Sequence, residues 1–210
     1  MKQQRLLVWA TIAAAFLLLG GAWWMARHGK HPMPALSPSV QFLEGGQPLP
    51  QFRLESTAGI FTNDNLHGHW TFLLFGYTHC PDVCPTSLSL LAAVTDRLQG
   101  QANEAPQVIF VSVDAPRDTL SVLRQYVPAF HPGFVGATGS DEALKPFTRD
   151  LGLYYVRNTE ERAGQEGGGY SVDHTSSIFL IAPDTRLRAV FQASADARQM
   201  ASDAEAIMTR

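Results

Sequence analysis

The chain has 210 residues, of which 45% are hydrophobic and 17% charged, with 19 acidic against 16 basic side chains and a formal net charge of -3. Three of the basic residues precede residue 30, whereas all the acidic residues follow it, so the rest of the chain is more acidic still. Such a surface without long charge runs excludes an electrostatic basis for binding nucleic acid or anionic lipid. The length suits one ordinary domain plus a short leading segment.

Residues 6–25 form an uncharged, mostly apolar run with basic residues on both sides. Such a run is long enough to cross a bilayer as a helix. Trp23 and Trp24 stand where a cleaved signal peptide would carry small residues, so a retained membrane anchor over residues 1–30 is favoured over a cleaved one. A single N-terminal anchor usually leaves the N-terminus in the cytoplasm. We therefore expect a single-pass protein of the inner (cytoplasmic) membrane with its C-terminal domain in the periplasm, which permits disulfides.

Residues 31–50 are rich in proline and glycine, a composition that resists regular structure. This stretch predicts a tether, and residues 51–210 then form the folded domain.

Apolar periodicity predicts the elements of that domain. Continuous apolar runs indicate buried strands, and apolar residues at helical spacing indicate amphipathic helices. In chain order the pattern predicts a strand at 70–77, a helix at 87–98, a strand at 107–113, helices at 119–127 and 141–151, a strand at 176–181, a turn at 183–184, a strand at 187–192 and a helix at 196–208. This order is typical of the α/β thioredoxin-like fold, a central mixed sheet flanked by helices. Its reactive residues lie where the first core strand meets its helix, here residues 78–85.

Cys80 and Cys84 are the only cysteines of the chain and fall in that junction, within FGYTHCPDVCP at residues 75–85. A structural disulfide is one interpretation. Closing so short a loop stabilises by only about 2 kcal/mol on the chain-entropy estimate. Residues i and i+4 of a helix also have Cβ atoms about 5 to 6 Å apart, beyond the roughly 3.5 to 4.5 Å that a disulfide needs. A purely structural disulfide between the two cysteines is therefore disfavoured.

Thiol redox chemistry is the second interpretation. A helix N-terminus stabilises a thiolate and makes it reactive. The usual redox motif on this fold, however, has two residues between its cysteines. Here there are three, and one of them, Asp82, opposes thiolate formation. No HExxH, Ser-His-Asp or glycine-rich phosphate motif competes with this site.

Metal binding is the third interpretation and depends on a third ligand. His174 immediately precedes the strand that runs past the cysteine loop in a thioredoxin-like sheet, so we expect it beside Cys80 and Cys84. His79 is nearer in sequence but would have to turn back onto Cys80, and we rank it second. Two thiolates and one imidazole without a fourth protein ligand fit trigonal Cu(I) better than a closed structural zinc site. An open site of this kind also lets another protein take the metal.

Two separated motifs carry a family resemblance. The segments GYTHCPDVCP at 76–85 and VDHTSSIFLIAPD at 172–184 resemble those of the Sco/SenC family. The segment VSVDAPRDT at 111–119 resembles a third family motif, although Ala115-Pro116 stands where the family commonly has Pro-Glu. Residues 153–155 also fit, and the similarity covers about residues 40–208.

The resemblance implies a membrane-tethered thioredoxin-like protein that delivers copper to the binuclear copper site of cytochrome c oxidase subunit II. It implies copper, as Cu(I) and/or Cu(II), bound by Cys80, Cys84 and His174. It places Asp82 and Asp173 near the site and makes Arg117 and Asp118 residues that hold loops. The glycine-rich segment 164–169 is then an insert beside the site.

Copper loading requires reduced thiols, whereas the outer compartment favours oxidation, so a periplasmic copper donor or thiol reductant is an expected partner. Two main hypotheses follow. The first is a copper metallochaperone. The second is a thiol-disulfide oxidoreductase in which Cys80 and Cys84 keep the cysteines of the target site reduced, and a redox or peroxide sensor is a weaker third.

Overall fold

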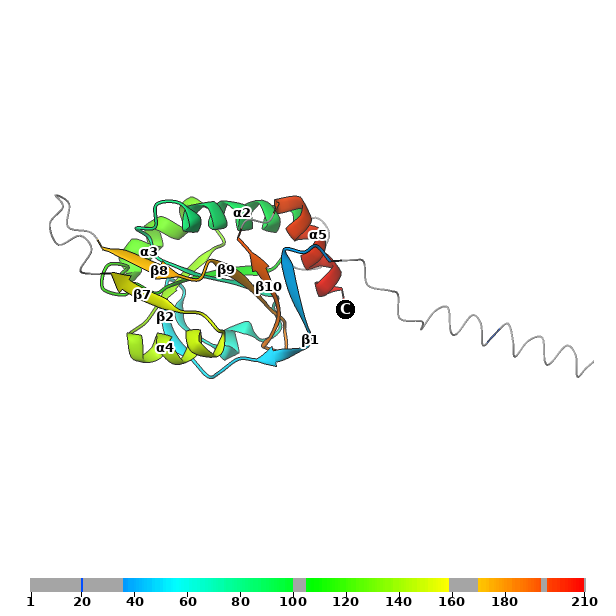
Figure 1. Ribbon diagram of the computed structural model, residues 1–210, viewed down its shortest axis with the longest axis horizontal. Helices are drawn as coiled ribbons and strands as arrows, with labels where there is room; N and C mark the ends of the chain where they lie inside the picture. The colour runs from blue at the N-terminus through cyan, green and yellow to red at the C-terminus, as the bar shows by residue number, and fades with distance from the viewer. Residues whose placement is uncertain (1–19, 21–35, 100–104, 159–169, 194–195, 210) are drawn as a thin grey trace, which may run out of the picture. The chain divides into compact units, whose positions relative to one another are not determined.

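An eight-stranded mixed sheet runs through the domain in the order β1-β10-β9-β4-β5-β6-β2-β3 (Figure 1). At its centre β4 (Thr71–Gly76) pairs in parallel with β5 (Gln107–Ser112), and β5 in parallel with β6 (Val135–Thr138). On the other side of β4 lie β9 (Ser177–Ile181) and β10 (Arg186–Gln192), which are antiparallel to each other. This arrangement confirms the predicted thioredoxin-like α/β sheet.

The computed structural model describes residues 20, 36–99, 105–158, 170–193 and 196–209. Residues 36–210 form one compact unit. The predicted membrane span at residues 6–25 lies outside the described residues except for Gly20, and the glycine-rich segment 164–169 lies wholly outside them. None of the helices in the described ranges is long and apolar enough to cross a bilayer.

The sheet has an edge strand that the sequence analysis assigned to the tether. β1 (Val40–Pro48) pairs antiparallel with β10, so the expectation of irregular structure does not hold for these residues. Gly45 and Gly46 have φ angles of 76° and 67°, and the register shifts between Phe42 and Gln47. The two glycines thus form a bulge within the strand, and an edge strand tolerates a proline such as Pro48.

The opposite edge consists of β2 (Arg53–Ser56) and β3 (Gly59–Thr62), an antiparallel hairpin that joins the sheet through β6. The sequence analysis predicted neither this hairpin nor β6. Each of these strands has four residues, which is too short to establish a period of two.

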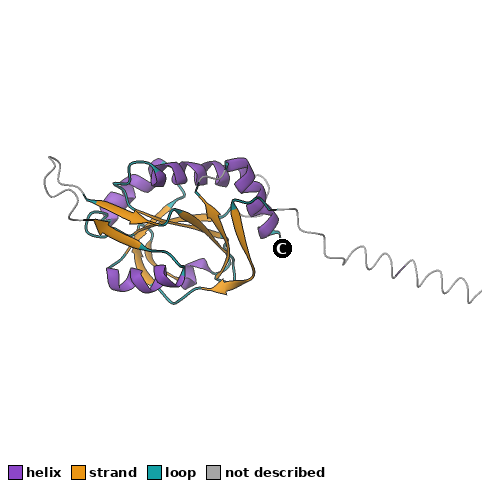
Figure 2. Cartoon of the chain, in the orientation of Figure 1, coloured by secondary structure: helices purple, strands orange, loops and turns teal. Residues whose placement is uncertain are grey.

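Helices cover both faces of the sheet. They are α2 (Val83–Leu98), α3 (Leu120–Tyr126), α4 (Asp141–Asp150) and α5 (Ala197–Met208), with short 3-10 turns at Asn63–Leu66 and Val127–Ala129. Figures 1 and 2 show α2, α3 and α5 along one side of the sheet and α4 on the other. All four match predicted helices, but α2 begins at Val83, four residues before the predicted start. Pro85 does not prevent this, because amides in the first turn of a helix have no intrahelical acceptor.

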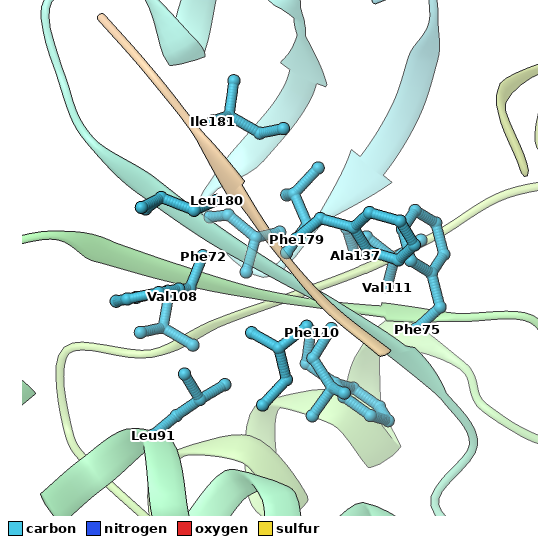
Figure 3. Close-up of a cluster of buried hydrophobic side chains, with 14 of the residues drawn as sticks. Phe72, Phe75, Leu91, Val108, Phe110, Val111, Ala137, Phe179, Leu180 and Ile181 are labelled. Atoms are coloured by element: carbon cyan, nitrogen blue, oxygen red, sulfur yellow. The ribbon is translucent and has the colours of Figure 1, made fainter. Parts of the chain in front are cut away.

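The core lies between the sheet and these helices. Every residue of β4 is buried, as its apolar run predicts, and its phenylalanines pack with side chains of β5 and β9 (Figure 3). On the α4 side, the Phe147 ring stacks on Phe52 at 4.3 Å between centroids and meets Phe75 edge-on at 5.5 Å. The packed strands form a rigid base for the loop that follows β4.

A separate two-stranded sheet, β7 (Tyr155–Asn158) with β8 (Ser171–His174), carries His174. In the described part of the chain, neither strand has a ladder partner in the large sheet. Side chains attach β7 to α4 instead. Arg157 donates to both Asp141 oxygens at 2.8 and 3.0 Å, and the Tyr155 hydroxyl donates to Asp141 at 3.1 Å. The sequence analysis did not predict this hairpin, whose short strands alternate polar and apolar residues over only four positions.

The attachment of β7 predicts a pH-dependent effect of Asp141→Asn. Hydrogen bonds from Arg157 hold the pKa of Asp141 below its ordinary value of 3.8, with further contributions from Tyr155 and Lys145. Because the folded pKa is lowered, the stabilisation is complete above the ordinary value and is lost as the pH falls through the folded one. We expect the variant to be less stable by about 1 kcal/mol at neutral pH, and the difference to disappear in acid. Urea unfolding across this range measures both; a pH-independent difference would contradict the assignment.

Candidate metal centre

The turn between β4 and α2 buries both cysteines. The Cys80 amide donates to the Tyr77 carbonyl at 3.2 Å, and the Cys84 amide lies 3.5 Å from Cys80 Sγ as a donor to it. Both are free thiols, with 8% of Cys80 and 1% of Cys84 exposed. Cys80 lies in the turn, whereas Cys84 lies in the first turn of α2, because the helix begins earlier than predicted.

Gly76, the last residue of β4, makes room for the Cys84 thiol. A Cβ atom at this position would lie 2.5 Å from Cys84 Sγ and 3.0 Å from a ring carbon of Phe110. No side chain fits there unless the thiol moves. Gly76 does not have a positive φ angle, so backbone conformation does not call for glycine here. Glycine is required at this position because of packing.

His174 reaches the thiols from β8. Its Nε2 lies 3.4 Å from Cys84 Sγ, and its Nδ1 lies 3.2 Å from the Thr175 carbonyl oxygen. A carbonyl oxygen only accepts, so Nδ1 carries the proton and Nε2 presents its lone pair to the thiols. Metal-binding histidines commonly show this second hydrogen bond. The Tyr77 ring meets the imidazole edge-on at 5.7 Å and limits its rotation.

Cys80, Cys84 and His174 thus form one cluster. One ligand atom from each lies within 4.8 Å of the other two, and no other group of three or more such side chains occurs in the described ranges. The predicted approach of His174 to the cysteine pair is what the structure shows.

Burial favours the neutral forms of Cys84 and His174. Desolvation raises the pKa of Cys84 far above its ordinary value, and desolvation lowers the pKa of His174, opposed by the Thr175 carbonyl and by Asp173. At neutral pH Cys84 is therefore a thiol that donates to the neutral imidazole. A bound cation would replace the thiol proton, so metal binding is coupled to proton release.

His79, the second-ranked ligand candidate, lies outside the cluster. Its side chain is 58% exposed, and its Nδ1 lies 3.1 Å from Thr78 Oγ1 and 3.8 Å from Asp118 Oδ1. Asp82 and Asp173 are also excluded from the cluster. The Asp82 carboxylate accepts from the Thr86 hydroxyl at 3.3 Å, and that of Asp173 accepts from Asn158 at 2.9 Å. Both acids lie beside the site in sequence but make surface hydrogen bonds.

Asp118 ties the cysteine loop to β5. It is fully buried and accepts from the Thr78 amide at 2.8 Å, the Thr78 hydroxyl at 2.6 Å and the Ser112 hydroxyl at 2.6 Å. Arg117 donates to Asp114 and to the Tyr170 carbonyl oxygen, the latter at 2.9 Å. Both residues have the loop-holding role that the resemblance implied.

Several residues of the site were not predicted from sequence, namely Gly76, Tyr77, Asp114 and Tyr170. Asp114 offered a weak signal, because it lies just after the carboxyl end of a buried strand, β5, next to the end of β4 where Gly76 lies. The roles of Tyr77 and Tyr170 depend on contacts across the fold and had no sequence signal.

The chain is similar to known proteins in both sequence and fold. A family model described as SCO1/SenC matches residues 44–209. The chain is 41% identical over 123 residues to "Protein SCO1 homolog 1, mitochondrial" of Arabidopsis thaliana, which covers 59% of this chain and only 35% of that protein. It is 35% identical to a "Putative copper-binding protein" of Stutzerimonas stutzeri over 71% of this chain and 72% of the relative. The crystal structure of Arabidopsis thaliana ScoI with copper bound superposes with a TM-score of 0.70 at 33% identity, covering 77% of this chain and 99% of that one.

The contact at Gly76 predicts a local effect of Gly76→Ala. The new methyl group displaces Cys84 Sγ, so we expect faster alkylation of Cys84 in the folded protein and a loss of about 1 to 3 kcal/mol of stability from overpacking. Alkylation is measured in a Cys80→Ser background, so that only Cys84 reacts.

Gly136→Ala in β6 is the matched control, because its Cβ would lie 2.9 Å from the Leu123 side chain of α3 rather than against a thiol. It should destabilise the fold and leave the reactivity of Cys84 unchanged. Equal reactivity in both glycine variants would refute the role of Gly76.

Proposed function

Because the chain belongs to the SCO1/SenC family, we propose that it binds one copper ion through Cys80, Cys84 and His174 and delivers it to the binuclear copper site of cytochrome c oxidase subunit II. Sco proteins form a family of cytochrome c oxidase assembly proteins. The single observation that carries the proposal is the convergence of two buried thiols and a neutral imidazole across 90 positions of sequence.

The donor set suits copper. Thiolates are soft ligands that favour Cu(I), and two thiolates with one imidazole complete a three-coordinate site. A structural zinc ion takes four protein ligands, and no fourth Cys, His, Asp or Glu joins the cluster in the described residues. The Cys84–His174 separation of 3.4 Å supports one ion shared by both, since metal–sulfur and metal–nitrogen bonds are about 2.0 to 2.3 Å long.

Transfer is supported by the unequal exposure of the ligands. Cys84 is fully buried against the end of β4, Cys80 is slightly exposed and His174 is half-buried. A groove of about 470 Å³ lies beside them, lined by Asp82, Val83 and Thr86 from the start of α2 and by residues that include Thr175 and Gln192. A thiolate or imidazole of a partner can approach along this groove, bind the three-coordinate ion and release the three ligands in turn.

Thiol-disulfide exchange is the second candidate, favoured by the two reduced thiols within 4.8 Å of each other. In that reaction the pair would become a disulfide and pass two electrons and two protons to a disulfide of the partner. The same two cysteines serve both functions, but only copper binding requires His174 as a ligand.

We also propose the cellular setting. Residues 1–30 would anchor the protein by a single helix in the inner membrane, with the folded domain in the periplasm, as the apolar run at 6–25 supports. A periplasmic copper donor or thiol reductant would load or restore the site there.

Changing the third ligand tests the proposal. His174→Ala removes a ligand and leaves both thiols. We expect one equivalent of Cu(I) to bind at least about 10-fold more weakly in competition titrations of the reduced domain, because loss of even an outer-shell partner of a ligand typically costs about 10- to 100-fold. His79→Ala is the matched control, because His79 lies outside the cluster, and it should bind as the parent protein does.

Oxidase assembly in cells distinguishes the two functions. Loss of assembly in the His174→Ala strain, restored by added copper, is the result that copper delivery predicts. Normal assembly in that strain would overturn copper delivery in favour of thiol chemistry.

A further inference from the structure

The hairpin that carries His174 needs a separate explanation for its position. The ladder bonds of β7 and β8 join only these two strands within the described residues. The pairing of β4 with β9 brings the start of β9, three residues after His174, beside the cysteine loop, but no ladder bond to the large sheet holds the hairpin itself in this part of the chain. Side-chain contacts must therefore hold the hairpin over the cysteines.

One fully buried carboxylate contacts both strands of the hairpin. Asp114, two residues after β5, accepts at 2.6 Å from the hydroxyl of Tyr170, the residue that directly precedes β8. Its Oδ1 also lies 3.4 Å from Arg157 Nε on β7. The second oxygen of Asp114 accepts from Arg117 Nε. A buried carboxylate is retained only where it is paired, and here two guanidinium groups and a hydroxyl surround it.

Arg117 reinforces the same attachment. Its guanidinium lies 3.7 Å from the centre of the Tyr170 ring and donates to the Tyr170 carbonyl oxygen at 2.9 Å. It also lies 5.7 Å from the Tyr77 ring, which in turn meets His174 edge-on. Arg117 thus contacts the start of β8 and the tyrosine against the imidazole.

The same turn also holds the other half of the site. Asp118, four residues after Asp114, fixes Thr78 in the cysteine loop. The two aspartates at either end of this turn therefore serve different ligands: Asp118 the cysteines, and Asp114 the histidine.

We propose that Asp114, with Arg117 and Tyr170, is the positioning group that places His174 over the two cysteines. Loss of this group would move the imidazole away from the metal and leave the two thiols in place. This inference rests on the proposed copper site. We call Asp114, Arg117 and Tyr170 together the histidine clamp. Asp118, in the same turn, holds the cysteine loop instead.

A double-mutant cycle tests the clamp. Tyr170→Phe removes the hydroxyl bonded to Asp114 but keeps the ring under Arg117, which spares the fold more than a change of the buried Asp114 does. We expect Tyr170→Phe to weaken Cu(I) binding about tenfold in the parent protein and to have no further effect in a His174→Ala background. A change that acted through general destabilisation would weaken binding in both backgrounds.

Thr78→Val is the matched contrast, because it removes a hydroxyl bond to Asp118 on the cysteine side. It should weaken Cu(I) binding equally with and without His174. Hydrogen exchange of the metal-free Tyr170→Phe protein should be faster in β8 and unchanged in β4, β5 and α2.

The outcomes separate the clamp from the site it serves. If Tyr170→Phe weakens Cu(I) binding equally in both backgrounds, or in neither, the clamp is refuted while the copper site stands. If His174→Ala alone leaves Cu(I) affinity unchanged, the ligand set is wrong and the proposed function falls with the inference.

Discussion

The contact between Cys84 Sγ and His174 Nε2 is the interaction on which the account of the site depends. The pairing of β4 with β9 makes it possible, because antiparallel partners Leu74 and Ile178 bring the end of one strand beside the start of the other. The cysteine loop leaves the end of β4, and His174 lies just before β9. The hydrophobic core between the sheet and its helices therefore determines where two short loops meet.

Burial gives this meeting point its chemistry. A thiol sealed against Gly76 and a desolvated imidazole form a neutral pair in the metal-free protein. A soft cation would replace the thiol proton and keep the local charge low, which a buried site favours. Two electrons leaving the same thiols would instead create a disulfide, so metal binding and redox chemistry compete for one pair of atoms.

The parts of the fold that the sequence predicted are those with long, uninterrupted patterns. β4, β5, β9 and the helices follow from apolar runs or helical spacing, and the site follows from where that order places Cys80, Cys84 and His174. Strands of four residues, such as β6 and β8, are too short to show a period. The glycines of the bulge at Gly45 and Gly46 interrupt the strand pattern of β1, so β1 was not predicted. Proline usually breaks a helix, so Pro85 caused the start of α2 to be predicted four residues too late. The place of Asp114 after a buried strand was only a weak signal of a site residue. Its positioning role was not predictable, because its partners Arg157 and Tyr170 become neighbours only in the folded chain.

The central claim is that one copper ion is held by two sulfur atoms and one imidazole of a single chain. X-ray absorption spectroscopy at the copper edge of the reduced, Cu(I)-loaded protein measures the ligand atoms directly. The account predicts two sulfur scatterers and one imidazole nitrogen per copper, with the imidazole absent in His174→Ala. A copper site with sulfur ligands alone in the parent protein would contradict it.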